Sequence, residues 1–116
     1  MNAENIFTEK RPWGEFRQFI KNERVTVKII TVKSGERTSL QYHNHRSEFW
    51  KIINGEGEVT VEERTIPVKA GDEIFVPQKA PHRIAGLDKS LELLEISLGD
   101  FDEGDIVRLE DNYGRS

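Results

Sequence analysis

The stretch GERTSLQYHNHRSEFWKIING, residues 35–55, contains two of the three histidines of the chain. Side chains two residues apart lie on the same face of an extended strand. Gln41, His43 and His45 are therefore expected to point the same way, and Glu48 can join them from the next strand after a tight corner. The third histidine lies far along the chain and has to arrive by folding. Two clustered histidines, a carboxylate and a distant histidine predict a site for a divalent ion.

Outward from this stretch, short segments rich in Val, Ile, Thr and Phe recur every eight to twelve residues. Turn residues separate most of them, and Asn54-Gly55 is the strongest hairpin signal. No segment shows a sustained helical stripe of apolar residues, so we predict one all-β domain over residues 1–116, a sandwich or barrel. The predicted strands are Glu15–Lys21, Val25–Lys33, Arg37–Tyr42, Glu48–Ile53, Gly57–Val61, Thr65–Lys69, Glu73–Val76, His82–Ala85, Leu91–Leu98 and Asp105–Leu109.

Composition excludes several classes of function. The 116 residues include 17 basic and 21 acidic ones, a net charge of −4, which argues against nucleic acid as a partner. There is no cysteine, so a metal has to be held by histidine, carboxylate or amide ligands. No apolar run is long enough for a membrane span, and the N-terminus MNAENIFTEK lacks a signal-peptide core. We therefore expect a cytoplasmic protein without membrane contact.

The spacing of these residues resembles the cupin family, whose first motif runs G-x5-H-x-H, then three or four residues, E-x6-G. In this chain Gly35, Gln41, His43, Glu48 and Gly55 keep those intervals, with Gln41 in place of the first histidine. The second motif, G-x5-P-x-G-x2-H-x3-N, is matched by Gly71, Pro77, Lys79, His82 and Gly86, where Lys79 replaces a glycine and Gly86 the asparagine. The resemblance implies a double-stranded β-helix, the jelly-roll barrel of cupins.

Three further runs narrow the resemblance. RPWGEF, SLQYHNHRSEFW and GDIVRLEDNYGR look like the C-terminal domain of type II phosphomannose isomerases, over about Arg11 to Arg115. Those domains are often fused to a mannose-1-phosphate guanylyltransferase (GDP-mannose pyrophosphorylase) domain, which is missing from this sequence. Phe49, where the family usually has histidine, and Lys79 depart from the family pattern. The resemblance implies a barrel over about residues 11–115 and isomerisation of mannose 6-phosphate to fructose 6-phosphate.

Two ligand sets for a divalent metal ion are consistent with the sequence. Cupin spacing gives Gln41, His43, Glu48 and His82, and a Gln-x-His pair also occurs in type I phosphomannose isomerases. The alternative replaces Gln41 by His45, because imidazole is the better ligand for most first-row ions. We favour the Gln41 set, since the intervals place the side chains. Zinc is the first choice of metal, with manganese, iron, cobalt or nickel as alternatives.

A sugar phosphate requires cations, and aldose–ketose isomerisation requires a base next to the metal. The candidate substrate-binding residues are Arg37, Arg46, Trp50 and Arg83. The candidate catalytic bases are Glu48, His45 and His82. For Trp50, packing in the core is the competing interpretation.

The ends of the chain suggest structural and partner roles. Trp13 and Phe16 are expected in the core or at an interface, and an N-terminal arm with Trp13 can cross to a second subunit, so we expect a homodimer. The tail residues Asp105, Arg108, Asp111, Tyr113 and Arg115 are expected to be structural. Alternative functions are a non-catalytic cupin that binds sugar or sugar phosphate, a sugar-nucleotide isomerase, a dioxygenase, or a subunit that pairs with a separate guanylyltransferase.

Overall fold

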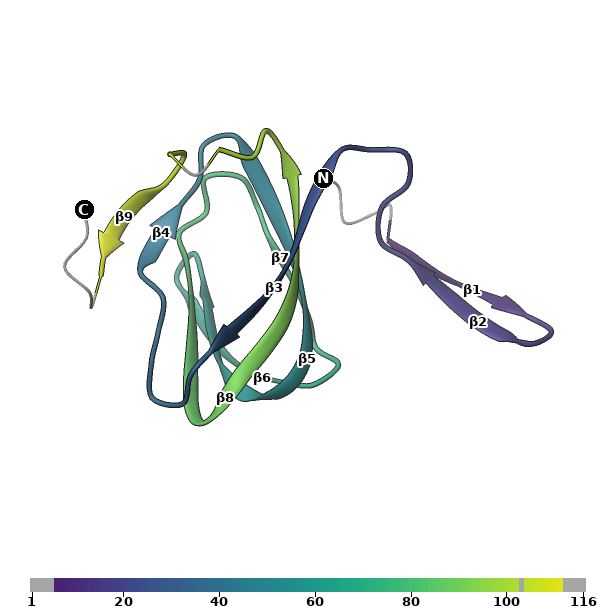
Figure 1. The fold of residues 1–116 in the computed structure, drawn as a ribbon, viewed down its shortest axis with the longest axis horizontal. Helices are drawn as coiled ribbons and strands as arrows, with labels where there is room; N and C mark the ends of the chain where they lie inside the picture. Colours follow the sequence, from purple (N-terminus) through teal and green to yellow (C-terminus); the bar gives the residue numbers. More distant parts are fainter. Residues whose placement is uncertain (1–5, 103, 112–116) are drawn as a thin grey trace.

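The computed structural model describes residues 6–102 and 104–111, and within them every regular element is a β-strand. β1 and β2 form a two-stranded sheet, while β3 to β9 form a seven-stranded sheet that curls around the core (Figure 1). The all-β prediction is confirmed. The strands are β1 (Phe7–Arg11), β2 (Gly14–Gln18), β3 (Val25–Val32), β4 (Leu40–Tyr42), β5 (Arg46–Val61), β6 (Arg64–Lys69), β7 (Glu73–Val76), β8 (His82–Gly99) and β9 (Val107–Glu110).

β5 and β8 are long antiparallel partners that pair along most of their length. Each unites two of the predicted strands, so the predicted hairpin at Asn54-Gly55 is wrong. Gly55 instead lies at an irregularity where the register between β5 and β8 shifts. Its φ is +87°, and a Cβ there would lie 1.9 Å from the carbonyl oxygen of Ser90. A glycine is therefore required where β5 bends from its pairing with β7 to its pairing with β6.

The apolar core lies between the two halves of the curled sheet. Its largest fully buried apolar members come from β5, β8 and β7: Trp50, Ile52, Val59, Leu91, Leu93 and Val76. Burying such side chains contributes roughly 1.5–3 kcal/mol each. The long strands therefore form the framework that carries the polar site at one end of the core.

β3 has the predicted alternation, but in its first half the apolar residues face outward. Val27 is 54 % exposed and Ile29 is 63 % exposed, whereas Lys28 is only half-buried toward the interior. Because β3 pairs opposite residues of β8, Lys28 lies beside Glu95 and Thr26 beside Ser97. The inner face of this half of β3 is therefore polar, whereas Ile30 and Val32 further along the strand face the apolar core.

The β1–β2 hairpin extends away from the large sheet (Figure 1). The sequence analysis did not predict β1, whose side chains are all exposed and so lack the expected alternation of burial. Trp13, at the turn between the two strands, is 74 % exposed, so it is not a core residue of this chain. Phe16 contacts Phe7 within the hairpin, with ring centroids 6.4 Å apart. In the described ranges no helix is long and apolar enough to cross a membrane.

Candidate metal centre

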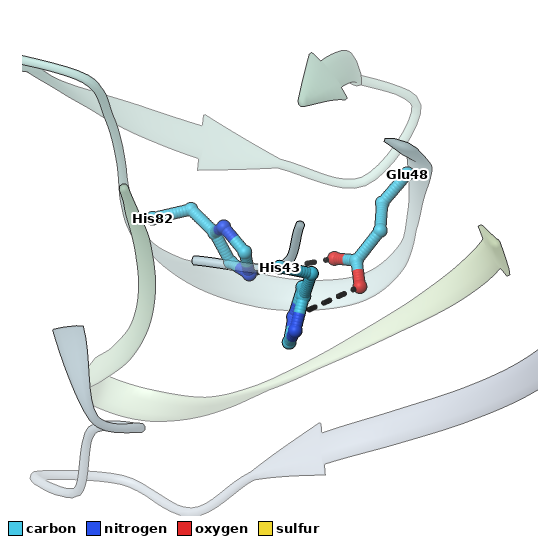
Figure 2. A group of neighbouring side chains, drawn as sticks. All are labelled: His43, Glu48 and His82. Carbon is cyan, nitrogen blue, oxygen red and sulfur yellow. Dashed lines mark ion pairs between the residues drawn. The ribbon is translucent and has the colours of Figure 1, made fainter. Parts of the chain in front are cut away.

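Three side chains from separate segments meet in the interior. His43 follows β4, Glu48 lies near the start of β5, and His82 begins β8. Each is at most 3 % exposed, and their possible ligand atoms all lie within 4.8 Å of one another. One oxygen of Glu48 is 3.4 Å from His43 Nε2, and the other is 3.6 Å from His82 Nε2 (Figure 2). The sequence spacing correctly predicted this convergence.

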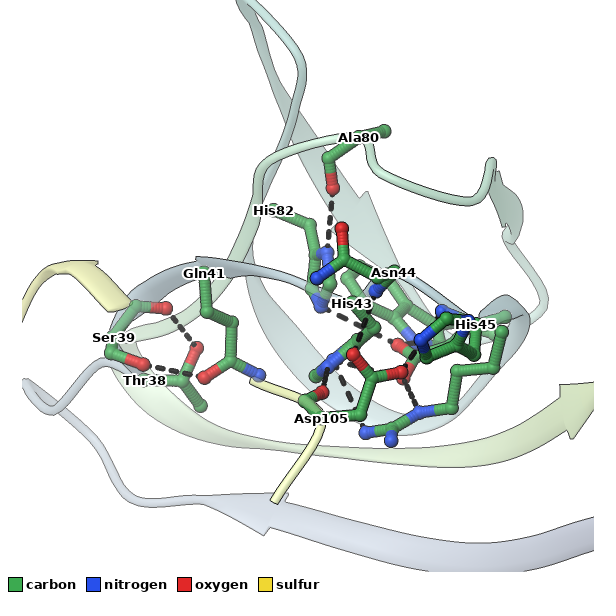
Figure 3. A network of polar contacts seen from close by, with 12 residues as sticks. Thr38, Ser39, Gln41, His43, Asn44, His45, Ala80, His82 and Asp105 are labelled. Atoms are coloured by element: carbon green, nitrogen blue, oxygen red, sulfur yellow. Dashed lines mark hydrogen bonds and ion pairs between the residues drawn. The ribbon is translucent and has the colours of Figure 1, made fainter. Parts of the chain in front are cut away.

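Backbone carbonyl groups orient both imidazole rings. His43 Nδ1 donates to the carbonyl oxygen of Asp105 at 2.7 Å, and His82 Nδ1 donates to that of Ala80 at 3.0 Å (Figure 3). A carbonyl oxygen only accepts, so each ring carries its proton on Nδ1 and directs the Nε2 lone pair toward Glu48. His82 Nε2 is buried and has no hydrogen-bond partner among the described residues. An orphaned lone pair in this position fits a metal ligand.

The protonation states suit the same role. Burial lowers the pKa of His43 to about 4, and the nearby Arg46 guanidinium acts in the same direction. Burial also lowers the pKa of His82. Both imidazoles are therefore neutral at pH 7, the form that binds a metal. Two neutral imidazoles and one carboxylate are donors that Zn²⁺, Mn²⁺, Fe²⁺ and Co²⁺ all accept, so the residues fit a divalent ion without selecting one.

Neighbouring side chains hold Glu48 in place. Trp50 Nε1 donates to one carboxylate oxygen at 3.2 Å, and Arg46 Nε donates to the other at 3.3 Å. Trp50 is fully buried within the apolar core, and its ring lies 5.7 Å from that of His82. A second Arg46 nitrogen lies 3.2 Å from His43 Nε2, and the guanidinium packs 4.4 Å from the Phe101 ring centroid. Both residues thus contact the cluster itself.

His45 differs from the expectation that it shares a face with His43. β4 ends at Tyr42 and the chain turns, so alternation no longer applies, and His45 is exposed outside the cluster. The carboxylate of Asp105 stabilises this turn by accepting hydrogen bonds from the backbone N–H groups of Asn44 and His45, each at 2.9 Å. The first of these bonds is the main reason why the pKa of Asp105 is lowered. Asp105 thus has the structural role expected of it.

Gln41 lies beside the cluster on β4, directly opposite His82 in the sheet. Its side-chain oxygen accepts a hydrogen bond from the Ser39 hydroxyl group, on the side of the cluster away from His45 (Figure 3). Gln41 is therefore adjacent to the three buried residues, and its role as a fourth ligand remains a prediction.

Lys79 replaces the glycine of the second cupin motif and has a φ of +69°. Its backbone N–H donates to the carbonyl oxygen of His43 at 2.9 Å, which ties the loop before His82 to the loop that carries His43. A left-handed conformation costs a non-glycine residue of order 1–3 kcal/mol. The departure from the motif therefore changes the cost of this turn, while the turn itself is retained.

Glu95 is a buried carboxylate of the interior that the sequence analysis missed. It lies on β8 opposite Trp50, and it is 6 % exposed. Burial, followed by the charge of Glu48, raises the pKa of Glu95 to about 7. The sequence indicated it by a glutamate inside the apolar run LELLEISL. Glu95 is two residues from both Leu93 and Ser97, so the three share one face of the strand.

Two further predicted substrate-binding cations are Arg83 and Arg37. Arg83 is 9 % exposed and donates to the backbone carbonyl oxygens of Thr38 at 2.9 Å and Glu110 at 3.4 Å. The side chain of Arg37 is exposed, and its backbone forms an isolated antiparallel β-bridge with that of Ala85 on β8. Arg108 and Asp111 belong to the described tail, whereas Tyr113 and Arg115 lie outside the described residues.

A curled all-β sheet with such a cluster inside defines the cupin class, and solved structures agree. A cupin-2 domain protein from Rhodospirillum rubrum superimposes with a TM-score of 0.63 at 20 % identity, over 87 % of this chain and 77 % of that one. Oxalate decarboxylase from Bacillus subtilis, which has Mn(II) centres, superimposes with a TM-score of 0.66 at 28 % identity, over 75 % of this chain and 24 % of that one.

Sequence comparison identifies the family within this class. The model "Mannose-6-phosphate isomerase C-terminal" matches residues 2–111, so the chain belongs to that family. The alginate biosynthesis protein AlgA of Pseudomonas aeruginosa is 41 % identical over 91 % of this chain and 22 % of its own length. The mannose-1-phosphate guanylyltransferase ManC of Salmonella typhimurium is 39 % identical over 90 % of this chain and 22 % of its own length. The chain therefore spans less than a quarter of these relatives.

Proposed function

We propose that this chain is a metal-dependent aldose–ketose isomerase that converts mannose 6-phosphate and fructose 6-phosphate into each other. The observation that carries the proposal is the buried cluster of His43, Glu48 and His82, with both histidine Nε2 atoms directed at one carboxylate. Membership of the mannose-6-phosphate isomerase C-terminal family supports the choice of sugar. A divalent ion held there would act as a Lewis acid on substrate oxygens.

The residues of the chain restrict where the substrate proton can be carried. His43 and His82 would bind the ion through Nε2, and their Nδ1 atoms already donate to carbonyl oxygens. Neither ring then has a nitrogen left for the substrate. Two of the predicted bases therefore remain. One is Glu48, which could use its second carboxylate oxygen, and the other is the exposed His45. Trp50 and Arg46 position the Glu48 carboxylate in either case.

The test is an assay of the purified chain with fructose 6-phosphate and, in turn, Zn²⁺, Mn²⁺, Fe²⁺, Co²⁺ and Ni²⁺. We expect mannose 6-phosphate to form with at least one ion and to disappear in His43→Gln. His45→Gln should keep metal binding, and its loss of kcat would identify His45 as the base. No product above the His43→Gln background with any ion would remove the isomerase proposal.

One observation favours a second candidate, a non-catalytic cupin that binds sugar phosphate. Arg46 places a cationic guanidinium 3.2 Å from His43 Nε2 and 3.3 Å from Glu48, so it can satisfy these two groups as a metal would. In that case the chain binds fructose 6-phosphate with unchanged affinity after chelation of metals, and without turnover. Co-purification with a guanylyltransferase would further indicate that the chain acts as a partner subunit.

A further inference from the structure

A cavity lies beside the metal cluster, between β3, β4 and β9. Its volume is about 540 Å³. Ser39 and Gln41 line it on the side nearest the cluster, and the charged side chains that line it come from the segment after β3 and from β9. These charged residues are Lys33, Glu36, Arg37 and Arg108. The cavity is therefore next to the cluster and is separate from it.

The register of the sheet connects the cavity with the cluster. Gln41 pairs with His82 of β8 on one side and with Arg108 of β9 on the other. Directly opposite residues of antiparallel strands place their side chains on the same face. His82, Gln41 and Arg108 thus form one row across the sheet, from the metal cluster to the cavity.

The charges of the cavity favour an anion. Three cations line it, Lys33, Arg37 and Arg108, against the single carboxylate of Glu36. The guanidinium of Arg83 lies close enough to interact with that of Arg37: burial and, secondly, the charge of Arg37 lower the pKa of Arg83, while Glu110 and Asp111 act in the opposite direction. Arginine is suited to phosphate because its planar guanidinium can donate two parallel hydrogen bonds.

The other two predicted arginines are engaged elsewhere. Arg46 contacts Glu48, His43 and the ring of Phe101 inside the cluster. The Arg83 guanidinium donates to two backbone carbonyl oxygens. Each is about 90 % buried in these contacts. Arg37 and Arg108 line the cavity, whereas Arg46 and Arg83 are not among its lining residues.

We propose that this cavity is the phosphate subsite of the sugar phosphate, with Arg37 and Arg108 as its anchors. Gln41 marks the boundary between the phosphate end and the end of the sugar that reacts at His43, Glu48 and His82. The identity of the sugar rests on the proposed function, whereas the anion site does not. Arg108 gains a binding role here, which the sequence analysis did not assign to it.

The experiment measures binding, so that it does not depend on turnover. Calorimetric titrations of the full chain with fructose 6-phosphate, fructose and inorganic phosphate are made with and without Mn²⁺. The variants are Arg37→Gln and Arg108→Gln, and the matched control is Arg64→Gln, which removes the same charge from β6, a strand that contributes nothing to the cavity. Circular dichroism verifies folding, and the exposed Arg37 provides a variant whose folding does not depend on a buried contact.

The wild-type chain should bind fructose 6-phosphate more tightly than fructose. Each cavity variant should reduce that preference at least about tenfold, because a charged hydrogen bond to phosphate is lost. Arg64→Gln should leave the preference unchanged. The proposal is overturned if wild type shows no preference, if both cavity variants keep it, or if the control loses it equally. If the preference for fructose 6-phosphate depends on these arginines but no isomerisation is seen, the phosphate subsite is supported and only the proposed isomerase activity is refuted.

Discussion

Folding shifts the pKa values of two buried groups, His43 and Glu95, in opposite directions, and the variant Glu95→Gln removes one of the two shifts. In the metal-free protein, burial lowers the pKa of His43 to about 4 from 6.5, while burial and Glu48 raise that of Glu95 to about 7 from 4.5. Below pH 6.5 the unfolded chain protonates its histidine and the folded chain does not, so this group reduces stability as pH falls. Glu95 has the opposite sign, because the folded state takes up its proton first.

The two contributions are similar in size. From pH 7 to pH 5, linkage gives about 2 kcal/mol of lost stability for His43 and about 2 kcal/mol of gained stability for Glu95. His82, whose pKa burial also lowers, adds to the loss. The wild-type free energy of unfolding should therefore change little or fall slightly. Glu95→Gln should lose about 2 kcal/mol or more over the same range, because the compensating group is gone.

The assay is urea unfolding followed by circular dichroism, with a chelator present, at several pH values between 7 and 5. His43→Gln should lose less stability than wild type over the same pH range, because only His82 then opposes Glu95. Glu92→Gln is the matched control, because it removes a carboxylate of the same strand outside the cluster. A Glu95→Gln profile parallel to that of wild type would refute the reasoning.

Three further changes test the framework. Gly55→Ala should destabilise the chain by more than about 2 kcal/mol in urea unfolding, because its Cβ meets a carbonyl oxygen, and by clearly more than Gly35→Ala, where nothing lies within 4 Å; equal losses would contradict the tight bend. Asp105→Ala should weaken Mn²⁺ binding about tenfold or more by releasing the loop of His43, and calorimetry that finds unchanged affinity would exclude this positioning role. If the β1–β2 hairpin crosses to a second subunit, sedimentation should show a dimer that Trp13→Ser shifts toward monomer, and a monomeric wild type would exclude the homodimer.

The sequence predicted the three buried residues of the site because their spacing is local to two motifs. His43 and Glu48 flank one corner, and the second motif supplies His82 at the start of a strand. The exposure of His45 was not predictable from alternation, since β4 ends at Tyr42, three residues before His45. Where a strand ends depends on partners far along the chain, here the loop of Asp105.

Features that depend on contacts between distant parts of the chain were harder to predict from the sequence. Asn54-Gly55 has the local chemistry of a turn, but pairing of β5 with β8 continues past it, so packing overrides the local preference. Glu95 faces Glu48 only through the register of β8 against β5. The row of His82, Gln41 and Arg108 likewise requires three strands that are distant in sequence. Register across a sheet, rather than residue type, determined what could not be predicted.

The central claim is that His43, Glu48 and His82 hold one divalent ion between them. Its most direct test is calorimetric titration of the chelator-treated chain with Mn²⁺ and with Zn²⁺, for wild type and for single glutamine variants of these residues and of His45. We predict one site per chain that His43→Gln, Glu48→Gln and His82→Gln each abolish and that His45→Gln retains. Binding that survives loss of either buried histidine, or that depends on His45, would contradict it.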